Sequence, residues 1–347
     1  MKSEPLTSPR GRAAEPPVRD GRLDVRGFQT WYRVTGDLDS GRVPVILLHG
    51  GPGYPSYSLE PMEALARTGR AVVRYDQLGC GESSLKHVPH DPAMFEPGLF
   101  IEELALLISE LGLDQYVLLG QSWGGMLALD FALTSPPRLA GLILYSTLAS
   151  IEEWTAATDA LLATLPEDVR SVLAELRGTG AVDSPEFKAA EHEFNRLFVC
   201  RLDPLPECAQ RSERSLESDG EVYRVMAGGS EFDNGAGMAV LQHWDVRPRL
   251  HEIAVPTLCI SGEFDEATPE VMGTLAAGIA GAKWHVLPDA SHCAHLETPH
   301  SFFPLVTDFL AHVDNWNGTH DRHACHARDW SRLGHRSRHC SPPRGAG

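Results

Sequence analysis

The chain has 347 residues, which suits one large α/β domain with an insertion, and 42% of them are hydrophobic, as in ordinary globular proteins. The net charge of −17 at pH 7 repels nucleic-acid phosphates and anionic membrane surfaces, so we expect neither as a partner. The seven cysteines are scattered without the spacing of a disulfide framework, which is typical of a protein in a reducing compartment.

Both ends of the chain are polar and lack apolar periodicity. Residues 1–24 contain no apolar core of a signal peptide, and residues 315–347 are rich in His, Arg and Ser, so we expect both segments to be disordered. Potential metal ligands lie close together in the second segment: His320, His323, Cys325 and His326. No second cluster at zinc-site spacing accompanies them, and we expect no bound metal. The sequence also lacks a run of about 18 apolar residues that could span a membrane, so it predicts a cytoplasmic protein.

Between these ends, short apolar runs alternate with helical patterns. The runs are rich in β-branched residues and end at turn residues: 43–50, 70–77, 115–121, 139–147, 256–263 and 283–289. Residues 100–113, between two of the runs, have apolar residues at helical spacing. This rhythm predicts the α/β class, with a mostly parallel central sheet and helices on both faces.

The rhythm lapses over residues 151–243, where amphipathic stretches follow one another without an intervening strand. We expect this segment to be a helical cap inserted into a core formed by residues 25–150 and 244–314. Aromatic residues of the cap could line an apolar pocket, although aromatic side chains at helical spacing more often pack inside a domain: Trp154, Phe194, Phe198, Tyr223 and Phe232.

The sharpest motif is G-x-S-x-G, formed by Gly120, Ser122 and Gly124 between a predicted strand and a helix-forming segment. This is the context of a nucleophile elbow, a tight turn that needs small neighbours and points the serine Oγ outward. It also directs the next backbone N–H, that of Trp123, toward a substrate carbonyl oxygen. We therefore predict that Ser122 is a nucleophile and that Trp123 contributes to an oxyanion hole.

A second motif, H-G-G-P-G, begins at His49 directly after another predicted strand. Glycines let the backbone approach a ligand closely, and an N–H group of this loop can complete the oxyanion hole. The best candidate for this second donor is Gly51.

An elbow serine needs a general base and an acid that orients it, and in this fold the acid precedes the histidine in the chain. His292 follows the predicted strand 283–289, and Asp265 occupies the matching place after strand 256–263. Both lie at the carboxyl ends of strands, where a parallel sheet assembles its site. We predict Asp265 and His292 as the other two members of a catalytic triad.

Other residues compete for these two roles. His285 lies within a predicted strand, whereas His295 and His300 lie toward the following helix, so each suits a surface or packing position. Asp289 is too close to the predicted base in the sequence, and Asp245 precedes its strand.

Taken together, the segments LLHGGPG, YDQLGCGESS, GQSWGG, GEFDEATP and ASHCAH resemble the proline iminopeptidase and amino-acid amidase family of α/β-hydrolases, over roughly residues 25–312. The pattern D-Q-x-G-x-G-x-S is more specific to this group than the elbow is. Its positions are Asp76, Gln77, Gly79, Gly81 and Ser83. We interpret it as a strand-end loop that braces the oxyanion loop, with a structural rather than a catalytic role.

The resemblance implies an α/β-hydrolase fold and a cofactor-free serine hydrolase. Its substrates would be short peptides, amino-acid amides or arylamides with an N-terminal proline or a small or apolar residue. It also implies that Glu231 and Glu266 bind the free amine of the substrate, although each would otherwise suit a surface acid. The sequence departs from the common family pattern at residues 227–229, which leaves the preferred side chain open.

Two alternatives remain. One is an esterase, lactonase or acyl-transfer enzyme on the same triad, which would not require a free α-amine. The other is a ligand-binding module on a hydrolase scaffold, which would be expected to lack part of the triad or of the oxyanion loop.

Overall fold

The structure, a computed structural model, describes residues 15–176, 179, 181, 183–228, 230 and 239–320. Its strands form one eight-stranded sheet in the order β1-β2-β4-β3-β5-β6-β7-β8. The strands are β1 Val18–Val25, β2 Phe28–Thr35, β3 Val45–Leu48, β4 Val72–Tyr75, β5 Tyr116–Gln121, β6 Leu139–Tyr145, β7 Thr257–Gly262 and β8 Lys283–Leu287. Strands β3 to β8 pair in parallel, whereas β1–β2 and β2–β4 are antiparallel. The predicted α/β class is therefore confirmed, and each predicted apolar run contains a strand.

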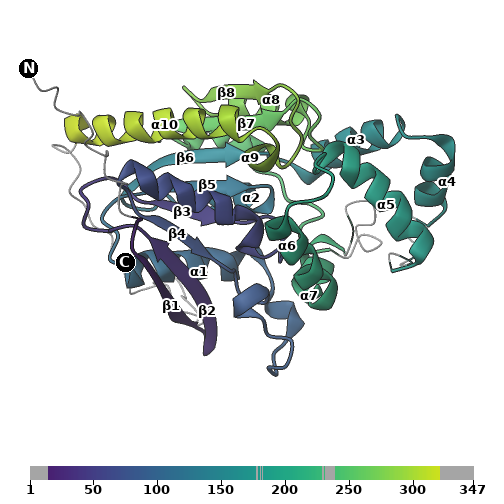
Figure 1. Cartoon of the computed structure of the whole chain (residues 1–347), viewed down its shortest axis with the longest axis horizontal. Helices are drawn as coiled ribbons and strands as arrows, with labels where there is room; N and C mark the ends of the chain where they lie inside the picture. The colour runs from purple at the N-terminus through teal and green to yellow at the C-terminus, as the bar shows by residue number, and fades with distance from the viewer. Residues whose placement is uncertain are drawn as a thin grey trace, which may run out of the picture.

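Helices cover both faces of this sheet (Figure 1). The helices are η1 Ser56–Thr68, α1 Pro97–Glu110, α2 Trp123–Ala132, α3 Ile151–Leu162, α4 Glu167–Leu176, α5 Pro185–Phe198, α6 Glu207–Ser218, α7 Glu221–Ala227, α8 Pro269–Gly278, α9 Ala294–Glu297 and α10 Pro299–His320, with short 3-10 turns η2 Gly81–Ser83, η3 Pro92–Met94 and η5 Arg247–Glu252. Among the residues that the structure describes, no helix has the length and apolar character needed to cross a membrane.

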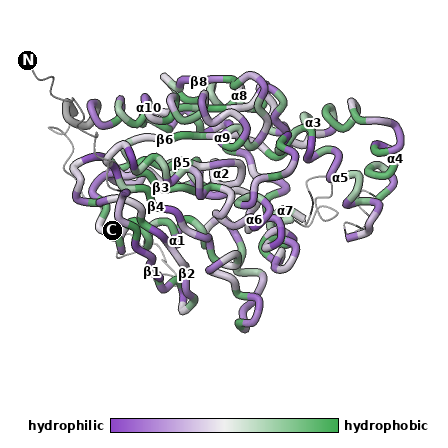
Figure 2. Tube along the Cα trace, viewed as in Figure 1, coloured by the Kyte–Doolittle hydropathy of each residue, from purple (hydrophilic) through white to green (hydrophobic). Residues whose placement is uncertain are grey.

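Two apolar clusters lie on opposite faces of the sheet. Helices α1, α2 and α8 pack on one face, and η1, α9 and α10 pack on the other. Because successive side chains of a strand point in opposite directions, β3 contributes Ile46 and Leu48 to the first cluster but Val45 and Leu47 to the second. Hydrophobic and hydrophilic residues alternate along the covering helices (Figure 2). The strands that carry the site motifs are thus held rigidly between two layers.

The first strand corrects the prediction for the N-terminus. Residues 1–24 were expected to be disordered, but β1 begins at Val18 and pairs with β2 through a turn at Arg26 and Gly27. This strand lies at the edge of the sheet, and most of its residues are exposed. Only towards its end do buried residues, Leu23 and Val25, alternate with exposed polar ones. Because the strand has few apolar residues and many charged ones, its composition is like that of a disordered segment, which explains the wrong prediction.

The C-terminal prediction also needs correction. Disorder was expected from residue 315, but α10 continues to His320. The helix is fixed to the core by Phe302, Val306 and Leu310, and its regular backbone continues beyond this apolar stretch. The remaining residues of the predicted tail, 321–347, lie outside the described part of the chain.

Helices α3 to α7 lie between β6 and β7, in the segment expected to be a cap. The chain leaves and re-enters the sheet at one point, where Ser150 and Asp245 form a β-bridge. Helices α3, α4 and α5 extend away from the sheet in Figure 1, and α4 and α5 enclose an apolar cluster that contains Phe187 and Phe194. Helix α6 instead packs on the core, where Ser212 Oγ donates a hydrogen bond to the Pro55 carbonyl at 2.7 Å.

The loop before α1 holds the end of α6 and the start of α7. His90 Nε2 lies 2.7 Å from Glu221 Oε2, and Lys86 Nζ donates to the Ser218 carbonyl at 2.6 Å. The hydrogen bond of His90 to the Val88 carbonyl, and then Glu221, raise the pKa of His90 above its usual 6.5. The protonated form of His90 is therefore favoured in the folded protein.

This shift predicts a pH-dependent stability. A raised pKa stabilises the fold fully below pH 6.5, and that stabilisation disappears as the pH rises above the folded-state pKa. Replacing His90 by Gln should lower Tm by about 1 °C at acidic pH, because a partly exposed pair contributes little. Calorimetry of the wild type and His90→Gln should show this difference at about pH 5.5 and none at about pH 9. An equal difference at both pH values would contradict the assignment.

Candidate active site

The turn between β5 and α2 has the geometry of a nucleophile elbow. Ser122 has φ 53° and ψ −123°, a region that costs a non-glycine residue roughly 1 to 3 kcal/mol. Its N–H group lies 3.1 Å from the Tyr145 carbonyl and 3.0 Å from that of Ser146, and Thr147 Oγ1 donates to the Ser122 carbonyl at 2.7 Å. These hydrogen bonds to β6 and the residues after it hold the strained turn in place.

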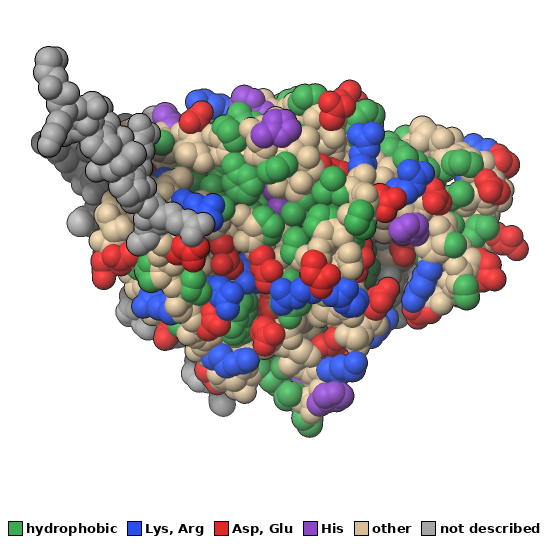
Figure 3. Space-filling model, viewed as in Figure 1, with side chains coloured by type: hydrophobic (Ala, Val, Ile, Leu, Met, Phe, Trp, Pro, Cys, Tyr) green, Lys and Arg blue, Asp and Glu red, His purple; other side chains and the backbone are tan. Residues whose placement is uncertain are grey.

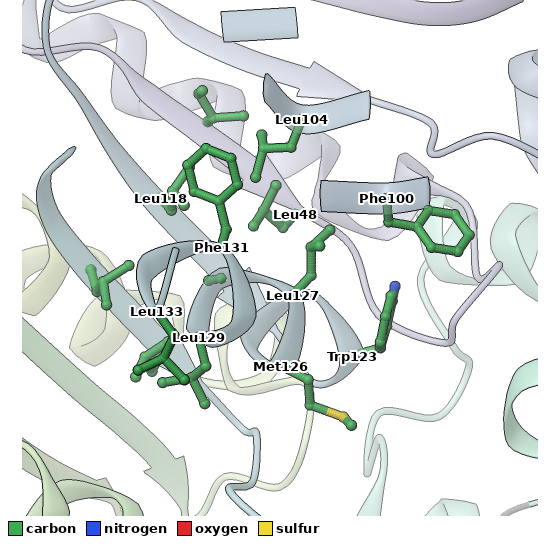
Figure 4. Close-up of a cluster of buried hydrophobic side chains, with 14 of the residues drawn as sticks. Leu48, Phe100, Leu104, Leu118, Trp123, Met126, Leu127, Leu129, Phe131 and Leu133 are labelled. Carbon is green, nitrogen blue, oxygen red and sulfur yellow. The ribbon is translucent and has the colours of Figure 1, made fainter. Parts of the chain in front are cut away.

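Small residues around the elbow are required by close packing. A Cβ atom on Gly120 would lie 2.2 Å from the Gly124 carbonyl oxygen, and one on Gly124 would lie 2.1 Å from the Leu48 carbonyl oxygen. Strand β3, strand β5 and helix α2 could not approach this closely with larger residues. Figure 4 shows the buried side chains of α2, among which Trp123 lies beside Phe100 from α1.

The predicted acid and base lie together. Asp265 Oδ1 is 2.8 Å from His292 Nδ1, and the carboxylate is 1% exposed. Its other partners are donors: Ser146 Oγ–H at 2.5 Å, the Gly262 N–H at 3.2 Å and the Ala267 N–H at 2.9 Å. These hydrogen bonds hold the Asp265 carboxylate in place beside the His292 ring.

One pocket joins these residues. Gly51, Ser122, Trp123, Glu266 and His292 all line it. Glu266 is almost fully buried, and its Oε1 lies 3.5 Å from His292 Nδ1. The pocket is otherwise mainly apolar, and the remaining lining residues are Pro52, Met126, Leu148, Ile151, Trp154, Thr155, Tyr223, Met226, Ala227, Ser230, Ala239, Leu241, Gln242 and Ala267.

Some predicted residues are not part of this description. Glu231 and Phe232 lie outside the described residues, as do His323, Cys325 and His326, and the side chain of His320. Of the cap aromatics, Trp154 and Tyr223 line the pocket, whereas Phe194 and Phe198 pack with the apolar cluster of α4 and α5. Within the described ranges, no group of three or more His, Cys, Asp or Glu residues could hold a metal ion.

The competing histidines and aspartates are placed elsewhere. His295 is buried, with Nε2 2.9 Å from the Ser58 carbonyl and Nδ1 3.1 Å from Tyr145 Oη, and burial lowers its pKa to about 4. This ring packs under η1 and does not line the pocket. The others are exposed: His285, His300, Asp289 and Asp245.

The H-G-G-P-G loop, predicted to contribute to an oxyanion hole, lies against the elbow. A Cβ atom on Gly50 would be 3.2 Å from Ser122 Cβ, and Gly51 has φ 109°, a conformation that favours glycine. A Cβ on Gly53 would meet Val222 Cβ of α7 at 3.0 Å, and one on Gly79 would meet Val222 Cγ2 at 2.5 Å. Helix α7 therefore sits directly on two glycine loops, which explains why both positions need the smallest residue.

The D-Q-x-G-x-G-x-S segment folds into a hydrogen-bonded loop. Asp76 Oδ1 accepts the N–H of Ser56 at 2.8 Å, and its Oδ2 accepts the N–H of Glu82, also at 2.8 Å. Ser83 Oγ donates to the Asp76 carbonyl at 2.6 Å. A Cβ on Gly81 would lie 2.2 Å from Asp76 Oδ2, so this glycine leaves room for the carboxylate.

Sequence reasoning missed the residues that hold the His292 loop. Gln121 Nε2 donates to the His292 carbonyl at 3.0 Å, and Tyr145 Oη–H donates to the same oxygen at 2.8 Å. Their only sequence signal is a polar residue at the carboxyl end of an apolar strand. That signal does not show which loop the side chain reaches.

The sheet order, the elbow and the Asp265–His292 pair are features of α/β-hydrolases. The family model for the alpha/beta hydrolase fold matches residues 43–299. A proline iminopeptidase of Heyndrickxia coagulans is 36% identical over 84% of this chain and 98% of the relative, and one of Clostridioides difficile is 33% identical over the same shares. A crystal structure of proline iminopeptidase from Mycobacterium smegmatis is 35% identical, with a TM-score of 0.78 over 86% of this chain and 99% of that one.

A crystal structure of VinJ is similar to the same extent. It is 37% identical, with a TM-score of 0.81 over 86% of this chain and 100% of that chain. The chain belongs to the proline iminopeptidase family of α/β-hydrolases.

Proposed function

We propose that the protein is a serine aminopeptidase that releases an N-terminal proline, or a small or apolar residue, from short peptides, amino-acid amides or arylamides. The observation that carries this proposal is the 2.8 Å pairing of Asp265 with His292, which lines the same pocket as Ser122. Relatives named proline iminopeptidase, similar over nearly their whole length, support the same substrate class.

In the first half of the reaction, Ser122 Oγ attacks the carbonyl carbon of the N-terminal residue while His292 Nε2 accepts the hydroxyl proton. Asp265 holds the proton on Nδ1 and stabilises the imidazolium that forms. The backbone N–H groups of Gly51 and Trp123 donate to the oxyanion of the tetrahedral intermediate. His292 then passes its proton to the leaving amine as the C–N bond breaks.

The second half removes the acyl group. A water molecule gives a proton to His292 and attacks the ester carbonyl of the acyl-enzyme. The new tetrahedral intermediate collapses, Ser122 Oγ leaves with the proton from His292, and the free amino acid is released. No cofactor takes part in these steps.

The substrate amine is assigned to acidic side chains. Glu266 offers a buried carboxylate in the pocket, and a charged hydrogen bond from an ammonium would fix where the peptide begins. Glu231 is proposed as the second carboxylate on the family resemblance alone. Trp154, Leu148 and Met126 provide apolar surface that suits a proline ring.

We also propose that the protein works in the cytoplasm on small substrates and not on nucleic acid. The scattered cysteines support a reducing compartment, and those that the structure describes have free thiols: Cys80, Cys200, Cys208, Cys259 and Cys293. Acidic side chains lie among basic ones on the face in Figure 3, so this surface offers no continuous basic patch for phosphates.

Substitution of Glu266 by Gln tests the amine assignment. Loss of one hydrogen bond to a charged group costs about 1.5 to 3 kcal/mol, which is a fall of about 10- to 150-fold in kcat/KM for a prolyl arylamide. An acetate ester, which has no amine, should be hydrolysed about equally by the variant and the wild type. Steady-state kinetics with both substrates measure this difference.

The matched control is Glu263→Gln, in the same loop but exposed and outside the pocket. It should leave kcat/KM unchanged for both substrates. Equal loss of ester and arylamide activity in Glu266→Gln would show that Glu266 supports the triad and does not recognise the amine. In that case the esterase alternative would gain support.

A further inference from the structure

Gln77 connects the two sides of the proposed oxyanion hole. Its side-chain Nε2 donates to the His49 carbonyl at 3.1 Å, and its Oε1 accepts the indole Nε1–H of Trp123 at 2.8 Å. The side chain is 1% exposed. It therefore touches the residue that starts the oxyanion loop and the residue that follows the nucleophile.

The two partners fix the orientation of the Gln77 amide. A carbonyl oxygen can only accept a hydrogen bond, and an indole N–H can only donate one. An amide is a neutral group that serves both at once. A glutamate of the same shape could accept from Trp123, but its second oxygen would face the His49 carbonyl without a proton between them.

The backbone of Gln77 acts on the same loop through the ring of His49. The Gln77 N–H donates to His49 Nε2 at 2.9 Å, which leaves the proton of the neutral ring on Nδ1. His49 Nδ1 lies 3.0 Å from the Gly50 carbonyl and so donates to it. His49 is completely buried, and burial lowers its pKa, which keeps the ring neutral.

This last hydrogen bond bears on the proposed oxyanion donor. The Gly50 carbonyl and the Gly51 N–H belong to one planar peptide group, in which the two bonds point in opposite directions when the peptide is trans. A donor that fixes the Gly50 carbonyl therefore fixes the direction of the Gly51 N–H.

We propose that Gln77 is a positioning residue for acyl transfer, which holds the residues that carry the Gly51 and Trp123 N–H groups in place relative to Ser122. Its side chain holds the His49 carbonyl and the Trp123 indole, and its backbone N–H, which the Gln77→Glu substitution keeps, holds the His49 ring. The inference rests on the proposed function, since it assumes that these two N–H groups stabilise an oxyanion. The D-Q-x-G-x-G-x-S loop would then not only support the fold but also contribute to stabilising the transition state.

The test uses Gln77→Glu, with Gln210→Glu as the matched control. The Gln210 side chain donates to the Leu205 carbonyl at 2.6 Å and accepts from Arg214 Nη1 at 3.3 Å, and it lies in α6, outside the pocket. Removal of a whole oxyanion donor costs about 100- to 1000-fold in kcat, so misdirected donors should cost roughly 10- to 100-fold. We expect this loss in kcat for both a prolyl arylamide and an acetate ester, with KM nearly unchanged and no loss in the control.

Two inhibitors separate positioning from general damage. L-prolinal forms a tetrahedral adduct with a serine hydroxyl, so its inhibition constant should rise by the same factor as kcat falls. L-prolinol has the ring and the amine but no carbonyl, and its inhibition constant should stay within about twofold. Unchanged kcat and prolinal affinity in folded Gln77→Glu would overturn the inference, as would a loss that appears equally for prolinol.

A second variant keeps the test decisive if Gln77→Glu does not fold. Trp123→Phe removes the indole donor but keeps the backbone N–H, so it should show a smaller loss in kcat, with prolinal affected and prolinol not. Full kcat and prolinal affinity in that variant would contradict the inference. The acetate ester makes this test independent of the substrate class. If the wild type cleaves the ester but no prolyl substrate, the proposed function is refuted, whereas the proposed role of Gln77 can still be tested with the ester.

Discussion

Replacing Ser122 by Ala should lower kcat for a prolyl arylamide by about a millionfold, because members of a triad act as a unit. The elbow should persist, since its backbone is held by the Tyr145 and Ser146 carbonyls and not by the serine hydroxyl. Circular dichroism and thermal unfolding should therefore match those of the wild type. Activity is measured at high enzyme concentration, so that the residual rate can be separated from contamination.

Ser230→Ala is the control for this experiment, because Ser230 is a second serine that lines the pocket. It should change kcat/KM by only a few fold. A folded Ser122→Ala protein with near wild-type turnover would remove Ser122 from the mechanism.

Replacing Asp265 by Asn should lower kcat by about ten-thousandfold, the size of effect seen when a triad aspartate loses its charge and the histidine its proper tautomer. The amide would also place N–H groups among the present donors, which include Ser146 Oγ and the Gly262 and Ala267 N–H groups. We expect the loss in kcat at all pH values at which the wild type is active.

Asp289→Asn is the control here, because Asp289 is the other aspartate near His292 in the sequence but is exposed. It should keep kcat within a few fold of the wild type. A large loss in Asp289→Asn, with little loss in Asp265→Asn, would reverse the assignment of the acid.

The sequence predicts the centre of the fold well because a parallel strand buried on both faces is an almost uninterrupted apolar run. Strands β3 to β7 each lie within such a run, whereas β8, at the other edge of the sheet, is mostly exposed. The β1–β2 hairpin escapes prediction because it lies at the edge of the sheet, where polar residues alternate with buried ones. A charged, alternating segment next to a polar terminus has the composition of a disordered one.

The candidate site was predictable where the sequence carries a backbone motif with small residues at fixed places, as at Ser122 and Gly51. It was not predictable where a side chain acts across the fold. Gln77, Gln121 and Tyr145 are ordinary polar residues at strand ends, and only the packed structure shows which carbonyl each one reaches. Similarly, helical spacing alone could not show that Trp154 faces the pocket while Phe194 packs between helices.

The central claim, cleavage after a free N-terminal residue, is tested most directly by one comparison on the wild-type enzyme. We predict that kcat/KM for prolyl arylamide is at least 10-fold higher than for its N-acetyl form, because acetylation removes the charge that the pocket carboxylate is proposed to bind and adds bulk beside it. Cleavage of the N-acetyl substrate at the same rate as the free one would contradict the aminopeptidase function.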